Sequence, residues 1–113
     1  MQGFAVTAEQ RGASIVVTAS GEIDYVTSPA FHDCLAGAIL QASHVVIDLA
    51  AVDFMDTSAL MVVVGHWKKL MAVDGTLALA GARKDYIRVL WVTGLAGQIP
   101  MFDTAEQAVS SFQ

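Results

Sequence analysis

The residues of this sequence best suited to chemistry are three consecutive polar side chains, Asp56, Thr57 and Ser58, between two short apolar stretches. A hydroxyl can accept a phosphoryl group, and Asp, Thr and Ser also begin helices by accepting hydrogen bonds from free backbone N–H groups. A phosphoryl group is well accommodated at a helix N-terminus, where those N–H groups and the helix dipole favour negative charge. Two interpretations follow: a helix cap alone, or a modification site that begins a helix.

The other side chains with chemical potential form no catalytic constellation. His32, His44 and His66 are scattered, and no pair has metal-ligand spacing, so we expect structural or surface roles for them. Cys34 is the only cysteine, which rules out a disulfide within the chain, and in an apolar helix stripe it would pack as a small hydrophobe. We therefore expect a protein without enzyme activity, cofactor or metal.

Composition narrows the class of protein. The chain has 113 residues, so we expect a single domain over residues 1–113, and its 55% hydrophobic content argues against disorder. The net charge is −5 and the basic residues form no cluster larger than a pair such as Lys68–Lys69, which argues against nucleic-acid binding. The N-terminus lacks a signal-peptide pattern, and the longest apolar run, Ala59–Val64, is too short to span a bilayer. We expect a cytoplasmic protein that does not insert into a membrane.

The first half of the chain predicts strands around one helix. Alternation over Phe4–Glu9 predicts an edge or hairpin strand, and the β-branched stretch Ser14–Ala19 predicts its antiparallel partner, ended by Gly21. Helical spacing of apolar residues starts at Ser28. His44–Leu49 is a short, nearly continuous apolar run, which is typical of a strand covered on both faces.

The second half predicts three helices and two strands. A helix begins near Ser58, and its inward stripe comprises Leu60, Val63, Val64, Trp67 and Met71. The later elements are a strand at Thr76–Ala80, a helix at Arg83–Val92 that stops at Thr93–Gly94, an edge strand at Ile99–Phe102 and a helix at Ala105–Ser111. Strands alternating with helices imply crossover connections, so the predicted class is α/β, with a mixed, mostly parallel sheet of about five strands and about four helices.

The outer side of the second predicted helix offers a possible contact surface. If Leu60 and Val63 face inward, Met61 and Val62 lie near the surface, one turn from Asp56–Ser58. Exposed methionine suits an adaptable interface. The alternative is that neighbouring loops cover both residues.

Four segments of the chain resemble one known family. The main segment is DLAAVDFMDTSALMVVVGHWKKL, from Asp48 to Leu70, and it resembles the core motif of STAS domains, especially of anti-sigma factor antagonists. Three further segments match in order: GEIDYVTSPAFHDCL (Gly21 to Leu35), VLWVTGL (Val89 to Leu95) and FDTAEQAV (Phe102 to Val109). Because the four are in register over nearly the whole chain, the resemblance implies a STAS fold.

The resemblance also implies a mechanism. Antagonists of this family bind an anti-sigma factor, a serine/threonine kinase with a histidine-kinase-like ATPase fold, and so release a sigma factor. The kinase phosphorylates the hydroxyl that follows the motif aspartate, the modified antagonist dissociates, and a phosphatase resets it. Carried over to this sequence, the acceptor is Thr57, with Ser58 as the alternative, and Asp56 is the acidic neighbour.

The resemblance and the helix pattern together give a set of partner-binding residues: Gly21, Glu22, Asp24, Thr27, Asp56, Thr57, Ser58, Ala59, Met61 and Val62. Two of them depart from the family pattern, since Thr57 replaces the commoner serine and Ala59 replaces glycine. Threonine keeps the hydroxyl but is stiffer at χ1. Alanine suits a helix better than glycine, and it restricts how closely a partner backbone can approach.

Two other functions remain open for a STAS domain. The chain could be a cytoplasmic subunit of an ABC-type lipid transporter that docks on the ATPase, because a fold does not determine a function. It could also be a small-molecule sensor, although the sequence shows no convergent polar lining for a pocket.

Overall fold

A computed structural model describes residues 3–92, 94 and 97–112 of the chain. Within that part the elements are β1 (Ala5–Arg11), β2 (Ser14–Ile23), α1 (Ser28–Gln41), β3 (His44–Met55), α2 (Thr57–Met71), β4 (Thr76–Ala80), α3 (Lys84–Val92), β5 (Met101–Phe102) and α4 (Ala105–Ser111). This order is the predicted one.

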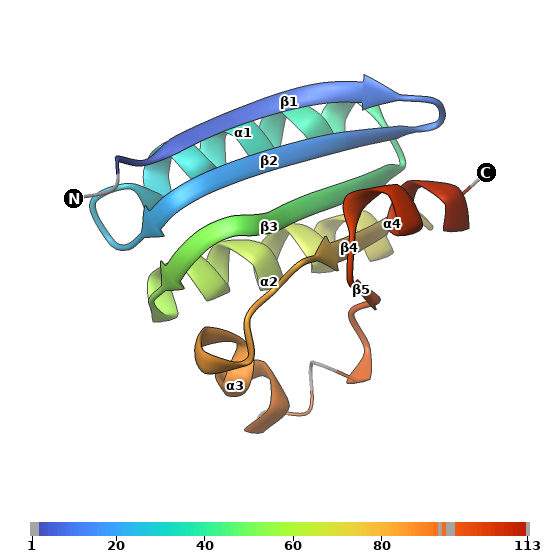
Figure 1. The fold of residues 1–113 in the computed structure, drawn as a ribbon. Helices are drawn as coiled ribbons and strands as arrows, with labels where there is room; N and C mark the ends of the chain where they lie inside the picture. The colour runs from blue at the N-terminus through green and yellow to red at the C-terminus, as the bar shows by residue number, and fades with distance from the viewer. Residues whose placement is uncertain (1–2, 93, 95–96, 113) are drawn as a thin grey trace.

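The strands form one sheet in which sequence neighbours are also spatial neighbours, in the order β1-β2-β3-β4-β5. β1 and β2 are antiparallel, and every later pair is parallel. Helices α1 and α2 lie on one face of the sheet, and α4 lies on the other (Figure 1). The predicted α/β class, with a mixed and mostly parallel sheet, is confirmed.

Two strands are longer than predicted, and their extensions carry the site. β2 continues through Gly21 to Ile23, and β3 continues beyond Leu49 to Met55. The extensions pair with each other through register shifts, and in β3 the alternation of buried and exposed residues is interrupted. Gly21 does not end the strand: it lies at one of these shifts with φ +85°, a conformation that glycine adopts without penalty.

The last strand is shorter than predicted. β5 consists of Met101 and Phe102 and pairs only with β4, as expected of an edge strand. Pro100 lies outside the strand, where its carbonyl oxygen accepts a hydrogen bond from the Leu79 N–H at 2.9 Å. The predicted stop of the third helix at Thr93 lies outside the described residues.

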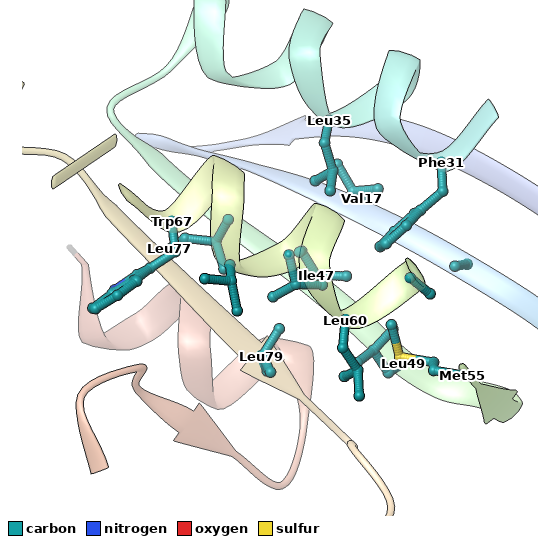
Figure 2. Packing of buried hydrophobic residues seen from close by; sticks show 14 of the residues in the cluster. Val17, Phe31, Leu35, Ile47, Leu49, Met55, Leu60, Trp67, Leu77 and Leu79 are labelled. Carbon is teal, nitrogen blue, oxygen red and sulfur yellow. The ribbon is translucent and has the colours of Figure 1, made fainter. Parts of the chain in front are cut away.

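The main core lies between the sheet and helices α1, α2 and α3. Figure 2 shows Leu35 of α1 beside Val17 of β2, and Leu60 of α2 beside Leu49 of β3. A smaller core on the opposite face joins β2, β3 and β4 to α4; its members include Val16, Val46, Ala78, Ala108 and Val109. Both sides of the central strands are therefore covered, which explains the nearly continuous apolar runs in their sequences.

One core prediction is wrong. Met71 was placed on the inward stripe of α2, but 52% of its surface is exposed. Leu70 is buried instead, because it lies three residues after the buried Trp67 on the same face of the helix.

We expect Gly21→Ala to destabilise the fold by at least about 1–2 kcal/mol, the cost of a left-handed residue with a Cβ. The added Cβ would also overlap the carbonyl oxygen of Gly3. Gly37→Ala in α1 is the matched control, since its Cβ would meet nothing within 4 Å and alanine favours a helix by about 1 kcal/mol. Urea unfolding of both variants measures the difference. Equal stability of the two variants would contradict the positive φ and the close approach to Gly3 as the reasons for glycine at position 21.

Candidate functional site

Two turns meet at one end of the sheet and form the candidate site. Because β2 and β3 are parallel, both strands run to the same edge of the sheet. There β2 leads into α1 and β3 leads into α2 (Figure 1). A backbone hydrogen bond joins the turns, from the Asp56 N–H to the Ile23 carbonyl oxygen at 3.0 Å. The loop before α1 and the residues that begin α2 are therefore held side by side.

Asp56 is the N-cap of α2 and the centre of this junction. Its backbone is extended, and its Oδ1 accepts hydrogen bonds from the Ala59 N–H at 3.0 Å and from Ser58 Oγ at 2.6 Å. The Tyr25 N–H of the neighbouring loop also hydrogen-bonds to the carboxylate. Desolvation acts to raise the pKa of Asp56, but these hydrogen bonds together outweigh it and hold the pKa below its ordinary value.

Thr57 and Ser58 are presented differently, although they are adjacent. Ser58 is half-buried, and its hydroxyl donates a hydrogen bond to the Asp56 carboxylate. Thr57 is the first residue of α2 and is exposed, and among the described residues its hydroxyl has no hydrogen-bond partner. Of the two predicted acceptors, Thr57 is thus the hydroxyl that an incoming group can reach without breaking a bond.

The loop before α1 is held by its own polar side chains. Asp24 Oδ1 accepts from the N–H groups of Val26 and Thr27 at 3.0 and 3.1 Å. The Thr27 hydroxyl accepts from the Asp24 N–H at 2.9 Å and lies 3.1 Å from the Glu22 carbonyl oxygen, to which it can donate. Asp24 and Thr27, both predicted partner-binding residues, therefore shape the loop.

The other predicted partner-binding residues divide by exposure. Glu22 and Met61 are exposed and Val62 is half-buried against the core, so the structure presents the first two to a partner. Gly21 and Ala59 are buried, so the free chain does not present them. Ala59 instead donates a backbone N–H to the helix cap at Asp56, and Gly21 lies with positive φ at a register shift between β2 and β3.

Sequence reasoning missed three apolar residues at this end. Tyr25 is 76% exposed, Val26 beside it is also exposed, and Phe54 is exposed near the end of β3, paired with Glu22. With Met61, these residues form what we call the turn surface: Tyr25, Val26, Phe54 and Met61. A signal was present in the sequence, since Tyr25 and Val26 are large apolar residues in an otherwise polar turn, where nothing requires them for folding.

The structure also brings together two histidines that the sequence left apart. His32 of α1 and His66 of α2 have ring centres 4.8 Å apart, and both line a hollow of about 240 Å³ that also contacts Ser58. Burial lowers the pKa of His66; the hydrogen bond to Val62 acts to raise it, and the charges of His32 and Lys69 lower it further. No two-residue spacing could have predicted this contact, because it forms across helices.

A larger hollow of about 500 Å³ lies between α3 and β5, away from the turns. Its polar side chains are Lys84, Arg88 and Asp103, all of them exposed and of both charge signs. A ligand site normally has a few fixed polar groups that orient the ligand. This hollow therefore lends no support to the small-molecule sensor.

The described parts of the chain lack two kinds of feature. Three or more His, Cys, Asp or Glu side chains nowhere gather there into a group that could hold a metal ion. None of the helices there has the length and apolar character needed to cross a membrane.

Comparison with known proteins shows the family. The STAS domain model matches residues 5–108, and the chain belongs to the STAS domain family. It is 31% identical over 104 residues to the anti-sigma-B factor antagonist of Bacillus subtilis (strain 168), covering 92% of this chain and 95% of the relative.

Solved structures agree with this assignment. The anti-sigma factor antagonist of Mycobacterium paratuberculosis superposes with a TM-score of 0.85 at 27% identity, covering 96% of this chain and 93% of the other. The Bacillus cell fate determinant SpoIIAA, solved in its phosphorylated form, superposes with a TM-score of 0.80 at 25% identity, covering 96% and 100%. The relatives named here are anti-sigma factor antagonists, and one of them was solved in a phosphorylated form.

We expect Asp56→Ala to lower the free energy of unfolding by about 1 kcal/mol, the usual cost of losing an N-cap. Asp53→Ala is the control, because Asp53 only makes an exposed ion pair with Arg83 at 3.7 Å, worth about 0–1 kcal/mol. Urea denaturation at pH 7 compares the two. A loss no larger for Asp56→Ala than for Asp53→Ala would contradict the capping role.

The contribution of Asp56 should also depend on pH. Its native pKa lies below the ordinary 3.8, so the folded state binds fewer protons than the unfolded state, and the carboxylate stabilises the fold above that value. This stability is lost as the pH falls through the native pKa. The stability difference between wild type and Asp56→Asn should be constant at neutral pH and shrink below about pH 4. A difference that stays unchanged at pH 2 would refute the assignment.

Proposed function

We propose that this protein is an anti-sigma factor antagonist that binds a serine/threonine kinase acting as anti-sigma factor and so releases a sigma factor. Phosphorylation of Thr57 switches the binding off in the cytoplasm, and a phosphatase restores it. One observation carries the assignment of the acceptor: Thr57 presents an exposed hydroxyl that has no partner among the described residues, while the Ser58 hydroxyl is bound to Asp56.

Phosphoryl transfer requires only that this chain present the Thr57 hydroxyl to the kinase. The kinase moves the γ-phosphoryl group of ATP to Thr57 Oγ1, so the bond to the ADP oxygen breaks, a new P–O bond forms, and the hydroxyl proton passes to a base of the kinase. The product carries about −1.5 to −2 charges at neutral pH. Thr57 and Ser58 contribute N–H groups of the first turn of α2, which favour an anion. The helix therefore tolerates the modification.

The partner interface does not tolerate it. The ionised carboxylate of Asp56 precedes the phosphothreonine, so the modification concentrates negative charge at one point. The turn surface, with Tyr25, Val26, Phe54 and Met61, frames this point with apolar side chains. When two apolar surfaces come into contact, they exclude water. A phosphoryl group at that contact would lose its hydration, which costs free energy, or it would keep the two surfaces apart. Phosphorylation thus weakens docking without unfolding the chain.

The family relatives support this function. The similar proteins named above are antagonists of anti-sigma factors, and SpoIIAA exists in a phosphorylated form. The match extends over nearly the whole chain, including the residues of both turns. Threonine in place of serine keeps the reacting oxygen and adds a methyl group that restricts χ1.

We expect phosphate incorporation to depend on Thr57. Wild-type chain and Thr57→Glu, used as baits in lysate of the source organism, should differ in one bound ATP-binding kinase, identified by mass spectrometry and held by wild type only. That kinase, purified and supplied with labelled ATP, should phosphorylate wild type and leave Thr57→Ala unlabelled. Thr57→Ala should still bind the kinase.

Ser58→Ala is the matched control, since it removes the neighbouring hydroxyl and leaves Thr57 in place. It should be labelled like wild type. Labelling of Thr57→Ala with loss of label in Ser58→Ala would reassign the acceptor. Capture of a transporter ATPase, equally by wild type and Thr57→Glu, would overturn the antagonist function in favour of the lipid-transport alternative.

Binding should also depend on the turn surface. Tyr25→Ala and Met61→Ala each remove an exposed side chain at little expected cost to the fold, and each should weaken kinase binding about tenfold or more, as for interface anchors. Leu40→Ala is the control, because Leu40 is 86% exposed on α1 near its C-terminal end, opposite the turns. Isothermal titration of the purified kinase measures the three affinities. Equal affinities would show that the partner docks elsewhere.

A further inference from the structure

A buried imidazole nitrogen on α2 has no partner. His66 is only 2% exposed, and its Nδ1 lies 2.8 Å from the Val62 carbonyl oxygen of the preceding helical turn. A carbonyl oxygen can only accept, so Nδ1 carries the proton, and in the neutral ring Nε2 carries the lone pair. Among the described residues Nε2 finds no hydrogen-bond donor, although it is shielded from solvent. Buried polar atoms without partners are uncommon and call for an explanation.

A second imidazole lies against this ring. His32 comes from α1, its ring centre is 4.8 Å from that of His66, and the two planes make an angle of 62°. Two imidazoles bound to one tetrahedral ion through bonds of about 2.0–2.1 Å have ring centres roughly 5 Å apart. The rings are therefore already at the separation that a shared ion requires.

We propose that His32 and His66 bind one Zn²⁺ ion between α1 and α2. The site is new relative to the antagonist function and does not depend on it. Neutral imidazole is a preferred ligand of zinc and other late first-row metals. The hydrogen bond from Nδ1 to a backbone carbonyl is the usual second-shell contact of a metal-binding histidine, since it fixes the ring and directs Nε2 to the ion. Binding to the ion would give His66 Nε2 the partner that it lacks among the described residues.

The surroundings of the two rings are compatible with an ion. Both histidines line the hollow of about 240 Å³, whose other walls are Ser58, Met61, Val62, Gly65 and Lys69. His32 is exposed enough to turn its ring, and its Nδ1 faces the Asp33 carboxylate at 3.4 Å. Lys69 is exposed, so its ammonium group can extend into solvent. The described residues offer no third ligand of the usual types, which leaves coordination positions for water.

Zinc bound here would tie α1 to α2 beside the residues that begin α2. An ion that binds only the folded chain stabilises it in proportion to the logarithm of its concentration. The binding can therefore be measured both directly and through the melting temperature, without any partner protein. Failure of this site would leave the antagonist function untouched, because the two tests share no readout.

The test is a titration of the tag-free, chelator-treated full chain with zinc chloride by isothermal calorimetry. Wild type should bind one ion saturably. Loss of a second-shell contact alone weakens metal sites about 10–100-fold, so His32→Gln and His66→Gln should each weaken binding by about tenfold or more. His32→Gln is the safer variant, since its side chain is exposed. Cobalt in place of zinc should give a visible absorption band that either variant loses.

Two control variants make the result decisive. His44→Gln alters the third histidine, which stacks on Phe112 instead, and should bind zinc like wild type. Cys34→Ala removes the free thiol on α1 and should also bind like wild type. Unchanged binding by His32→Gln, loss in either control, or absence of saturable binding by wild type would each overturn the site. Zinc should raise the melting temperature of wild type and leave that of His32→Gln unchanged.

Discussion

The hydrogen bonds of Asp56 are the constraint on which the rest of the site depends. Its N–H reaches the end of β2, and its carboxylate binds the first turn of α2 and the Tyr25 N–H of the loop before α1. Two turns that are about thirty residues apart in the chain thereby become one surface. The parallel pairing of β2 and β3 brings them to the same edge, and the pairing continues through the register shifts on either side of Gly21.

The same carboxylate also distinguishes the two hydroxyls beside it. By accepting a hydrogen bond from the Ser58 hydroxyl it stabilises the helix cap, and in doing so it occupies one of the two possible acceptors. Thr57, at the first helical position, faces away from this network into solvent. The same motif can therefore both cap the helix and carry a modification. Asp56 and Ser58 fix the start of the helix, and Thr57 presents the hydroxyl that is left. A negative group added there meets the helix dipole favourably and the carboxylate unfavourably.

Element order and fold class were predictable from the sequence because apolar spacing follows the period of each element. The end of β3 was not, because its alternation breaks at the register shifts. The end of β2 was not, because a glycine inside a strand weakens the pattern that predicts it. The cap at Asp56 was predictable, since capping residues act within one helical turn. Thr57 as the acceptor came from the family resemblance and stays a prediction. Tyr25 and Phe54 were missed because their exposure depends on how the two turns meet, and the contact of His32 with His66 depends on how two helices pack.

Met61 connects the turn surface to the histidine contact, because it lies one helical turn after Thr57 and lines the same hollow as His66. Evolution of a binding surface can explain an exposed methionine. It cannot explain His66 Nε2, which has no partner among the described residues, because no docking protein reaches an atom shielded from solvent. Such an atom costs free energy in every folded state unless something small satisfies it. A single ion is small enough to do so, and the neighbouring imidazole is the reason to prefer a metal to a water molecule.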